Sequence, residues 1–252
     1  MEGKAKGGNA RLARARHSVR GRVQAALARA GWEVRPLAGD ADERRAKLLA
    51  SEGIDVVLDV GANVGQYASK LRDSGYSGRI VSFEPYGQAY TQLERTASRD
   101  PGWQARRIAL GEEAGEVELN VSGNSFSSSL LPIRERHVEI APDAAYVDRE
   151  VVPALRLDAI WDELVAAGER VWLKLDVQGF ELPVLRGAGE RLALTHAVQV
   201  ELSLTSLYEG DVLWLELGEW LRERGFELVG VEPGHEDPNS GRLIQFDGVF
   251  VR

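Results

Sequence analysis

The chain has 252 residues, of which 44% are hydrophobic, so it is long and apolar enough to bury the core of one α/β domain. It contains no cysteine, which excludes disulfides, thiolate catalysis and cysteine-ligated zinc. Its net charge is −8, and no apolar run approaches the roughly 18 residues that span a bilayer. Because no signal-peptide pattern opens the chain, we expect a cytoplasmic protein without a membrane span.

The first segment of the chain differs in charge from the rest. Residues 1–35 hold nine Lys/Arg against two Glu, a net of +7, so the remaining residues carry −15. Apolar residues recur there at helical spacing and predict an amphipathic helix that packs on the domain or on a second copy in a homo-oligomer. Anchoring to an acidic partner stays open as an alternative. We expect residues 1–52 to form this basic arm with helices, and residues 53–252 to form the main domain.

The most informative segment begins at a β-branched run, residues 56–60. It continues into two glycines four positions apart, Gly61 and Gly65, and then into a helical pattern from residue 66. Strand, tight turn and helix in this order predict a nucleoside-cofactor site, because backbone N–H groups point outward at such a turn. A second strand, residues 79–83, ends at Glu84, where a carboxylate is placed to accept hydrogen bonds from ribose hydroxyls.

The turn also indicates which cofactor fits. Asn63 stands where a dinucleotide fingerprint needs its middle glycine, which disfavours a pyrophosphate. Asp59 at the end of the first strand would repel phosphate but attract a cation, and S-adenosylmethionine carries an ammonium and a sulfonium beside its adenosine. We therefore predict S-adenosylmethionine, with Asp59 as a partner of its ammonium, directly or through water. The predicted cofactor-binding residues are Asp59, Gly61, Ala62, Asn63, Gly65, Glu84, Pro85 and Asp176.

The remaining elements alternate along the chain. We expect helices over residues 42–51, 89–98, 182–194 and 214–224, and strands over residues 104–110, 116–122, 171–176, 197–202, 226–231 and 242–251. Residues 123–148 form a long irregular stretch, of the kind that is usually functional in a compact domain. Strands that alternate with helices predict a mainly parallel sheet covered on both faces.

Several blocks together resemble the FkbM-like family of S-adenosylmethionine-dependent methyltransferases. They are Leu58-Asp59-Val60-Gly61-Ala62-Asn63-Val64-Gly65, Ser82-Phe83-Glu84-Pro85, Leu173-Lys174-Leu175-Asp176-Val177-Gln178-Gly179-Phe180-Glu181, Val200-Glu201-Leu202-Ser203 and the closing run from Gly241 to Phe250. The resemblance covers about residues 53–252. It implies a three-layer α/β/α Rossmann-like class I fold whose seven-stranded sheet ends in an antiparallel strand. It also implies O-methylation of a hydroxyl on a sugar or a polyketide-type natural product. One departure is visible, because many members carry Glu where this chain has Gln178.

Two acidic residues are candidates for the chemistry. Asp176 and Glu201 end neighbouring strands, so both carboxylates project to the same rim of the sheet. Either could act as the general base that accepts the proton of a hydroxyl. Alternatively, the two could share a divalent cation such as Mg²⁺, which holds the hydroxyl and lowers its pKa. The general base is our first choice, because two acids are few ligands for a metal.

Further candidates and alternatives stay open. His137 lies in the long irregular stretch and is a candidate base, and Lys174 shares a strand side with Asp176. A nicotinamide-dependent dehydrogenase would need the missing glycine and a Tyr-x-x-x-Lys relay. A nucleic-acid or other macromolecular methyltransferase would use the basic arm as a tether. Because residues 36–252 are acidic, we expect a small-molecule acceptor rather than a nucleic acid.

Overall fold

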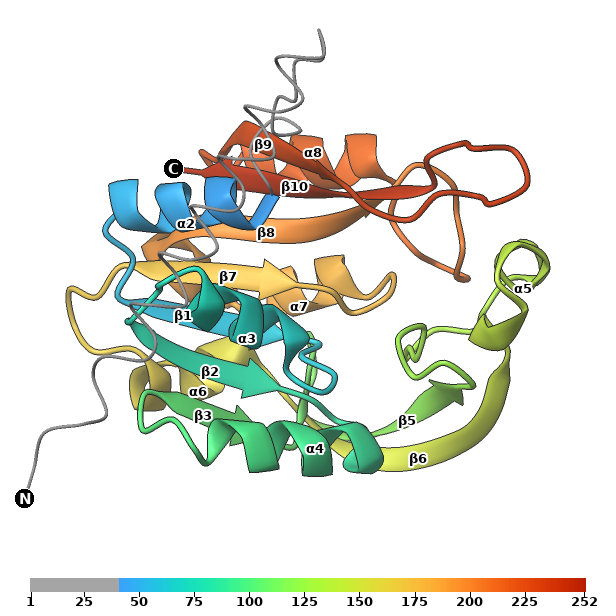
Figure 1. The fold of residues 1–252 in the computed structure, drawn as a ribbon, viewed down its shortest axis with the longest axis horizontal. Coiled ribbons are helices and arrows are strands. Elements are labelled where there is room, and N and C mark those ends of the chain that lie inside the picture. The colour runs from blue at the N-terminus through green and yellow to red at the C-terminus, as the bar shows by residue number, and fades with distance from the viewer. Residues whose placement is uncertain (1–40) are drawn as a thin grey trace, which may run out of the picture. The chain divides into compact units, whose positions relative to one another are not determined.

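The computed structural model describes residues 41–252, and the amphipathic helix predicted within residues 1–35 lies outside them. The described unit is built on a seven-stranded sheet (Figure 1). In sheet order the strands are β3 (Trp103–Arg106), β2 (Arg79–Phe83), β1 (Val56–Val60), β7 (Val171–Leu175), β8 (Thr195–Ser203), β10 (Gln245–Val251) and β9 (Glu227–Pro233). Both pairings of β10 are antiparallel and the other pairings are parallel. The predicted three-layer α/β/α Rossmann-like fold, with a seven-stranded sheet and an antiparallel last strand, is confirmed.

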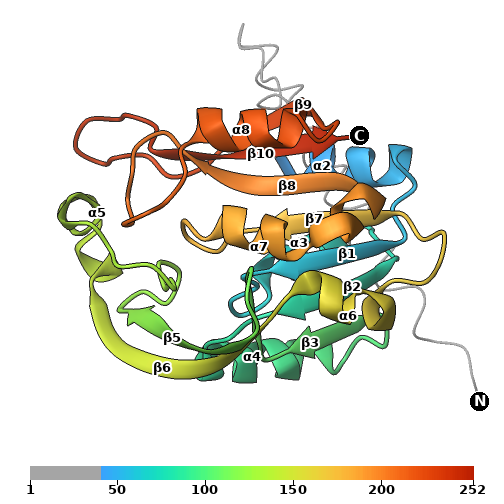
Figure 2. The ribbon, with the colours of Figure 1, turned by 180° about the vertical axis from the view of Figure 1, so that it is seen from behind.

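Two layers of helices cover the sheet. Figure 1 shows α2 (Ala41–Ser51), α3 (Gln66–Asp73) and α4 (Gly87–Ala97) on one face. Figure 2 shows α6 (Leu157–Leu164), α7 (Glu181–Gly187) and α8 (Trp214–Arg222) on the other, with the 3₁₀ helix η2 (Gly189–Leu194) after α7. Successive strand residues point to opposite faces, so Val57 packs in the apolar cluster of α2 to α4 and Leu58 in that of α6 to α8. No helix among residues 41–252 is long and apolar enough to cross a bilayer.

A smaller sheet lies beyond the carboxyl ends of the parallel strands (Figure 1). It contains β4 (Ala109–Leu110), β6 (Tyr146–Leu155) and β5 (Gly115–Ser122) in that order, and the connection from β5 to β6 carries α5 (Glu135–Ile140) and the 3₁₀ helix η1 (Pro142–Ala144). This region corrects the sequence analysis. The single strand expected over residues 104–110 is two strands in different sheets. Strand β6 was not expected, because charged residues and Pro153 interrupt its apolar pattern.

Strand order fixes where a ligand can bind. From β1 the chain proceeds outward through β2 and β3, whereas β7 and β8 proceed outward on the other side. The crevice between the carboxyl ends of β1 and β7 is therefore the topological switch point, at which open α/β sheets bind their ligands. Gly61 and Asp176 follow these two strands directly, so the sequence motifs with candidate chemistry converge there.

Two helical glycines differ in how closely neighbouring segments approach them. A Cβ at Gly187 in α7 would lie 2.0 Å from the backbone oxygen of Gly111, whereas a Cβ at Gly218 in α8 would meet its nearest atom at 4.0 Å. We expect Gly187→Ala to lower the free energy of unfolding by about 1–3 kcal/mol through overpacking. Gly218→Ala should raise it by about 0.5–1 kcal/mol, because alanine loses less backbone entropy in a helix. Denaturant unfolding measures both, and equal effects would contradict the close approach.

Candidate active site

A cavity of about 510 Å³ lies at the switch point, which is within the size range of small-molecule sites. Its lining comes from the turns after β1, β2 and β7, from residues 124–130 and from the ends of β8 and β10. Among the sequence-predicted residues, the cavity wall contains Gly61, Ala62, Asn63, Glu84, Pro85, His137, Lys174, Asp176 and Glu201. Asp59 and Gly65 are buried behind that wall.

The turn after β1 is tied to Glu84. Asn63 adopts a left-handed φ of 48°, and its backbone N–H donates to Oε2 of Glu84 at 2.7 Å. The backbone N–H of Tyr86 donates to Oε1 of the same carboxylate at 2.8 Å. Each oxygen of Glu84 keeps a second lone pair for a ligand hydroxyl. Burial raises the pKa of Glu84 to about 7, although both N–H donors favour its ionised form.

One part of the cavity wall is apolar. It lies beside Glu84, next to the break between β3 and β4, and the smaller sheet supplies much of it. Its members are Pro85, Ile108, Leu110, Leu119 and Leu130. An apolar wall next to a carboxylate that can bind two hydroxyls matches a flat base attached to a ribose. The side chains present therefore fit the nucleoside half of S-adenosylmethionine.

A row of buried polar side chains crosses the sheet below the cavity. Ser82, Asp59, Lys174 and Gln199 occupy paired positions on four neighbouring strands, and we call them the polar row. Oγ of Ser82 donates to Asp59 at 3.0 Å, and Nζ of Lys174 lies 3.1 Å from Oδ1 of Asp59. Burial alone would lower the pKa of Lys174, but the carboxylates of Asp59 and Asp176 outweigh it, so the pKa is raised. Lys174 is therefore a fixed cation.

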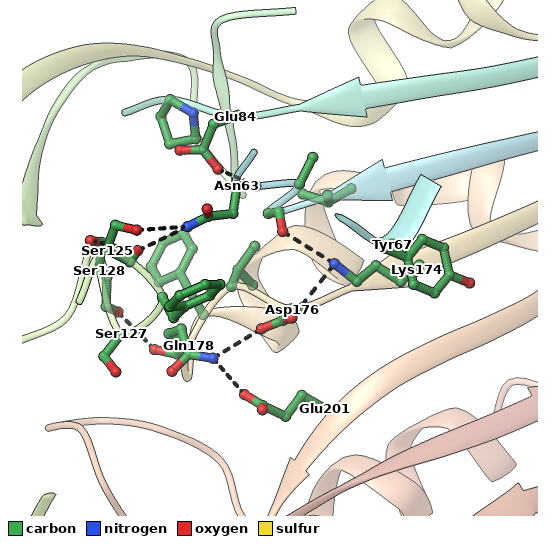
Figure 3. Close-up of a pocket in the computed structure, with 18 of the residues that line it drawn as sticks. Asn63, Tyr67, Glu84, Ser125, Ser127, Ser128, Lys174, Asp176, Gln178 and Glu201 are labelled. Atoms are coloured by element: carbon green, nitrogen blue, oxygen red, sulfur yellow. Dashed lines mark hydrogen bonds and ion pairs between the residues drawn. The ribbon is translucent and has the colours of Figure 1, made fainter. Parts of the chain in front are cut away.

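Lys174 connects the two halves of the site. Its Nζ donates to the carbonyl oxygen of Gly61 at 3.1 Å and lies 3.6 Å from Oδ2 of Asp176 (Figure 3). Two cations lie near the ring of Tyr67: Nζ of Lys174 is 5.2 Å from the ring centroid, and the guanidinium carbon of Arg45 is 5.0 Å from it. Asp59 thus has an internal cation as its partner, and its predicted contact with the cofactor ammonium stays a prediction.

Asp176 and Glu201 meet at the rim, as the strand order predicts. The amide of Gln178 lies between them, and its Nε2 donates to Oδ1 of Asp176 and to Oε2 of Glu201, both at 2.9 Å (Figure 3). The Asp176 side chain is 42% exposed toward the cavity. Burial, followed by the nearby carboxylate of Asp176, raises the pKa of Glu201 well above its ordinary value. The N–H groups that Gln178 and Gln245 donate to Oε2 of Glu201 act in the opposite sense, because they favour the ionised carboxylate.

This arrangement does not fit the metal alternative. A shared cation would bind between the carboxylates of Asp176 and Glu201, where the two amide hydrogens of Gln178 point. Within residues 41–252, no group of three or more His, Cys, Asp or Glu side chains is arranged to hold a metal ion. A positively charged ion and an N–H donor cannot both use the same carboxylate lone pairs.

His137 lies on α5 and closes one side of the cavity. It is buried, and its ring contacts Tyr208 edge-on with 5.2 Å between the centroids. Burial, with a smaller effect of His235, lowers its pKa to about 4. His137 is therefore neutral at physiological pH, as a proton acceptor must be, and its role stays a prediction.

A serine-rich turn, residues 124–130, lines the rim of the cavity. The side chain of Asn63 donates to the backbone oxygen of Ser125 at 3.2 Å (Figure 3). Oγ of Ser129 donates to the backbone oxygen of Gln178 at 2.7 Å. The serine-rich turn therefore contacts both the turn after β1 and the residues after β7. Phe126 at its tip is 59% exposed and borders the cavity.

Comparison with known proteins identifies the family. The family model of the methyltransferase FkbM domain matches residues 59–228. This range includes the glycine turn after β1 and the motif around Asp176. The chain belongs to the FkbM methyltransferase family. The predicted family is thus confirmed.

Curated relatives of this FkbM protein are methyltransferases. The hexuronic acid methyltransferase AglP of Haloferax volcanii is 28% identical over 68% of this chain. The match covers 65% of that relative's own length. The methyltransferase sdnD of Sordaria araneosa is also 28% identical, over 69% of this chain and 74% of its own length. The solved magnesium protoporphyrin IX methyltransferase of Synechocystis PCC 6803, with bound S-adenosylmethionine, has 10% identity and a TM-score of 0.45 over 84% of this chain and 77% of its own.

Several residues of the FkbM site had not been expected. They are Arg45, Tyr67, Tyr208, Gln245 and Asp247. Asp247 could have been found, because it is an acid within an apolar last strand, and it pairs in register with Glu201. Arg45 and Tyr208 carry no such signal, since tertiary contacts alone bring them to the site.

The Lys174–Asp59 pair gives a stability prediction. Lys174→Met should lower the free energy of unfolding by about 3–5 kcal/mol, because it leaves a fully buried carboxylate without its cation. Adding Asp59→Asn should recover part of that loss. As a control, Arg149→Met removes the partner of Glu118 from an exposed pair and should change stability little. Calorimetric unfolding of the four proteins decides this, and a harmless Lys174→Met would contradict the ion pair.

Proposed function

We propose that this protein transfers the methyl group of S-adenosylmethionine to a hydroxyl of a small molecule, with Asp176 as the general base. The observation that carries the proposal is the position of the Asp176 carboxylate. It is exposed to the cavity, it follows the strand next to the glycine turn, and it is oriented by Gln178. A base at that position borders both the cofactor half and the open half of the cavity.

The residues around the cavity have separate roles in binding the cofactor. Glu84 accepts hydrogen bonds from the ribose hydroxyls, and the apolar wall beside it contacts the adenine ring. The backbone of residues 61–63 borders the methionine half. When bound, S-adenosylmethionine supplies an electrophilic methyl carbon on a positively charged sulfur. The carboxylates around the cavity suit that charge.

Asp176 acts on the acceptor. Its carboxylate accepts the hydroxyl proton while the acceptor oxygen bonds to the methyl carbon and the carbon–sulfur bond breaks, leaving its electron pair on sulfur. Glu201 is the less suitable base, because the amides of Gln178 and Gln245 both donate to its Oε2. Lys174 fixes the position of Asp176 relative to the glycine turn. The serine-rich turn excludes water from the cavity.

The acceptor we propose is a hydroxylated small molecule such as a sugar or a polyketide-type natural product. One support is the cavity volume of about 510 Å³, and another is that a relative acts on hexuronic acid by its name. A macromolecular acceptor tethered by residues 1–35 is the alternative, which rests on their charge alone. A gel-shift with nucleic acid that weakens steeply with salt would favour it.

Cofactor binding tests the role of Glu84. We expect Glu84→Ala to weaken S-adenosylmethionine binding by about 1.5–3 kcal/mol, the scale of a charged hydrogen bond. Because the pKa of Glu84 is about 7 and the ionised form accepts from hydroxyls, wild-type affinity should rise as the pH rises through that value. Glu84→Gln should remove this rise. Titration calorimetry measures all three proteins, with the exposed Glu113→Ala as the control, and an unchanged Glu84→Ala affinity would remove Glu84 from the site.

Methyl transfer tests the role of Asp176. Asp176→Asn keeps the shape of the side chain and removes its basicity, so kcat should fall by about 10²–10⁴-fold, and the Kd of S-adenosylmethionine, which loses one nearby negative charge, should rise by a much smaller factor. Acceptors come from a mass-shift screen of sugars and polyketide-type compounds. Asp162→Asn, which alters an exposed acid on α6, is the matched control. Normal turnover by Asp176→Asn would refute the base assignment.

A further inference from the structure

The amide of Gln178 has an unusual set of partners. Its two N–H groups go to two different carboxylates, Asp176 and Glu201, each at 2.9 Å. Two carboxylates this close repel each other, and a divalent cation or a pair of N–H donors can hold them together. Here the side chain that follows Asp176 by two positions supplies the donors.

The orientation of this amide is fixed from both ends. The hydroxyl of Tyr208, itself fully buried, donates to Oε1 of Gln178 at 2.8 Å. A reversed amide would point its oxygen at two carboxylates and its NH₂ group at the hydroxyl, which costs two donor contacts. The backbone is fixed as well, because Gln178 adopts a left-handed φ of 55° and its carbonyl oxygen accepts from Ser129.

A second amide completes the arrangement around Glu201. Nε2 of Gln245 donates to the same Oε2 atom at 2.8 Å. Glu201 therefore receives N–H groups from Gln178 and Gln245 and needs no metal to be satisfied. Asp176 receives one N–H on Oδ1, while its Oδ2 faces Lys174 at 3.6 Å.

We propose that the Gln178 carboxamide takes the place of a bridging divalent cation, so that it orients Asp176 and makes the site independent of metal. The orientation of Asp176 for catalysis rests on the proposed function, whereas the independence of the site from metal does not. Gln178 is thus a positioning residue, which acts on the acceptor through Asp176. A carboxylate at position 178 would give three acids around one point and create a divalent-cation site.

Cation binding tests this inference without any methyl transfer. Thermal unfolding of the full chain is followed during titration with MnCl₂ for wild type, Gln178→Glu and Gln245→Glu. We expect no saturable shift for wild type. Gln178→Glu should gain a saturable rise of about 3–6 °C at ten times its Kd for Mn²⁺. Gln245→Glu adds the same charge beside Glu201 without reaching Asp176, and it should show no such rise.

Each outcome decides. A saturable wild-type shift, a Gln178→Glu protein that ignores Mn²⁺, or equal responses of the two variants would overturn the proposal. If Gln178→Glu does not fold, Gln178→Met takes its place, since it removes both donors. Its kcat should then fall at least tenfold with an unchanged Kd for S-adenosylmethionine, and EDTA should leave wild-type turnover unaffected. Loss of wild-type turnover in EDTA would refute the inference, whereas normal turnover of Asp176→Asn would refute only the proposed base.

Discussion

The site depends on the ion pair between Lys174 and Asp59. Both side chains lie within a sheet that is covered on both faces, and Asp59 is fully buried. A buried charge is tolerated only when it is paired and hydrogen-bonded, and here Ser82 donates to Asp59 while the carbonyl oxygen of Gly61 accepts from Lys174. Strand register makes the pairing, because Asp59 and Lys174 are direct partners in β1 and β7.

Pairing at this position determines the geometry above it. Lys174 contacts the glycine turn through Gly61 and the reactive rim through Asp176, so one rigid cation sets the relation between the two halves of the cavity. The same cation leaves the rim acidic, because Asp59 already neutralises it. Under the proposed function, this charge favours the positively charged cofactor over its neutral thioether product and assists product release.

Local sequence was sufficient for most of the fold. The pattern of residues 56–65 predicts strand, turn and helix, and the structure has β1, the turn and α3 there. Local patterns failed where tertiary context overrides them. Residues 104–110 look like one strand but change sheet at Arg107 and Ile108, and β6 pairs despite Pro153, which lies just before the positions where β4 joins.

The candidate site, too, could be predicted from sequence only in part. Residues near the carboxyl ends of parallel strands, such as Asp176 and Glu201, can be placed from sequence, because those ends share one edge of the sheet. Residues that fix the orientation of these acids cannot, since Tyr208 and Gln245 are distant in sequence and only tertiary contacts bring them to the rim. From the sequence, a neutral amide at position 178 already argues against a metal site. Only the structure shows that this amide donates to both Asp176 and Glu201 and so takes the place of a metal. Functional interpretation of such motifs therefore requires the donors around each carboxylate as well as the carboxylates themselves.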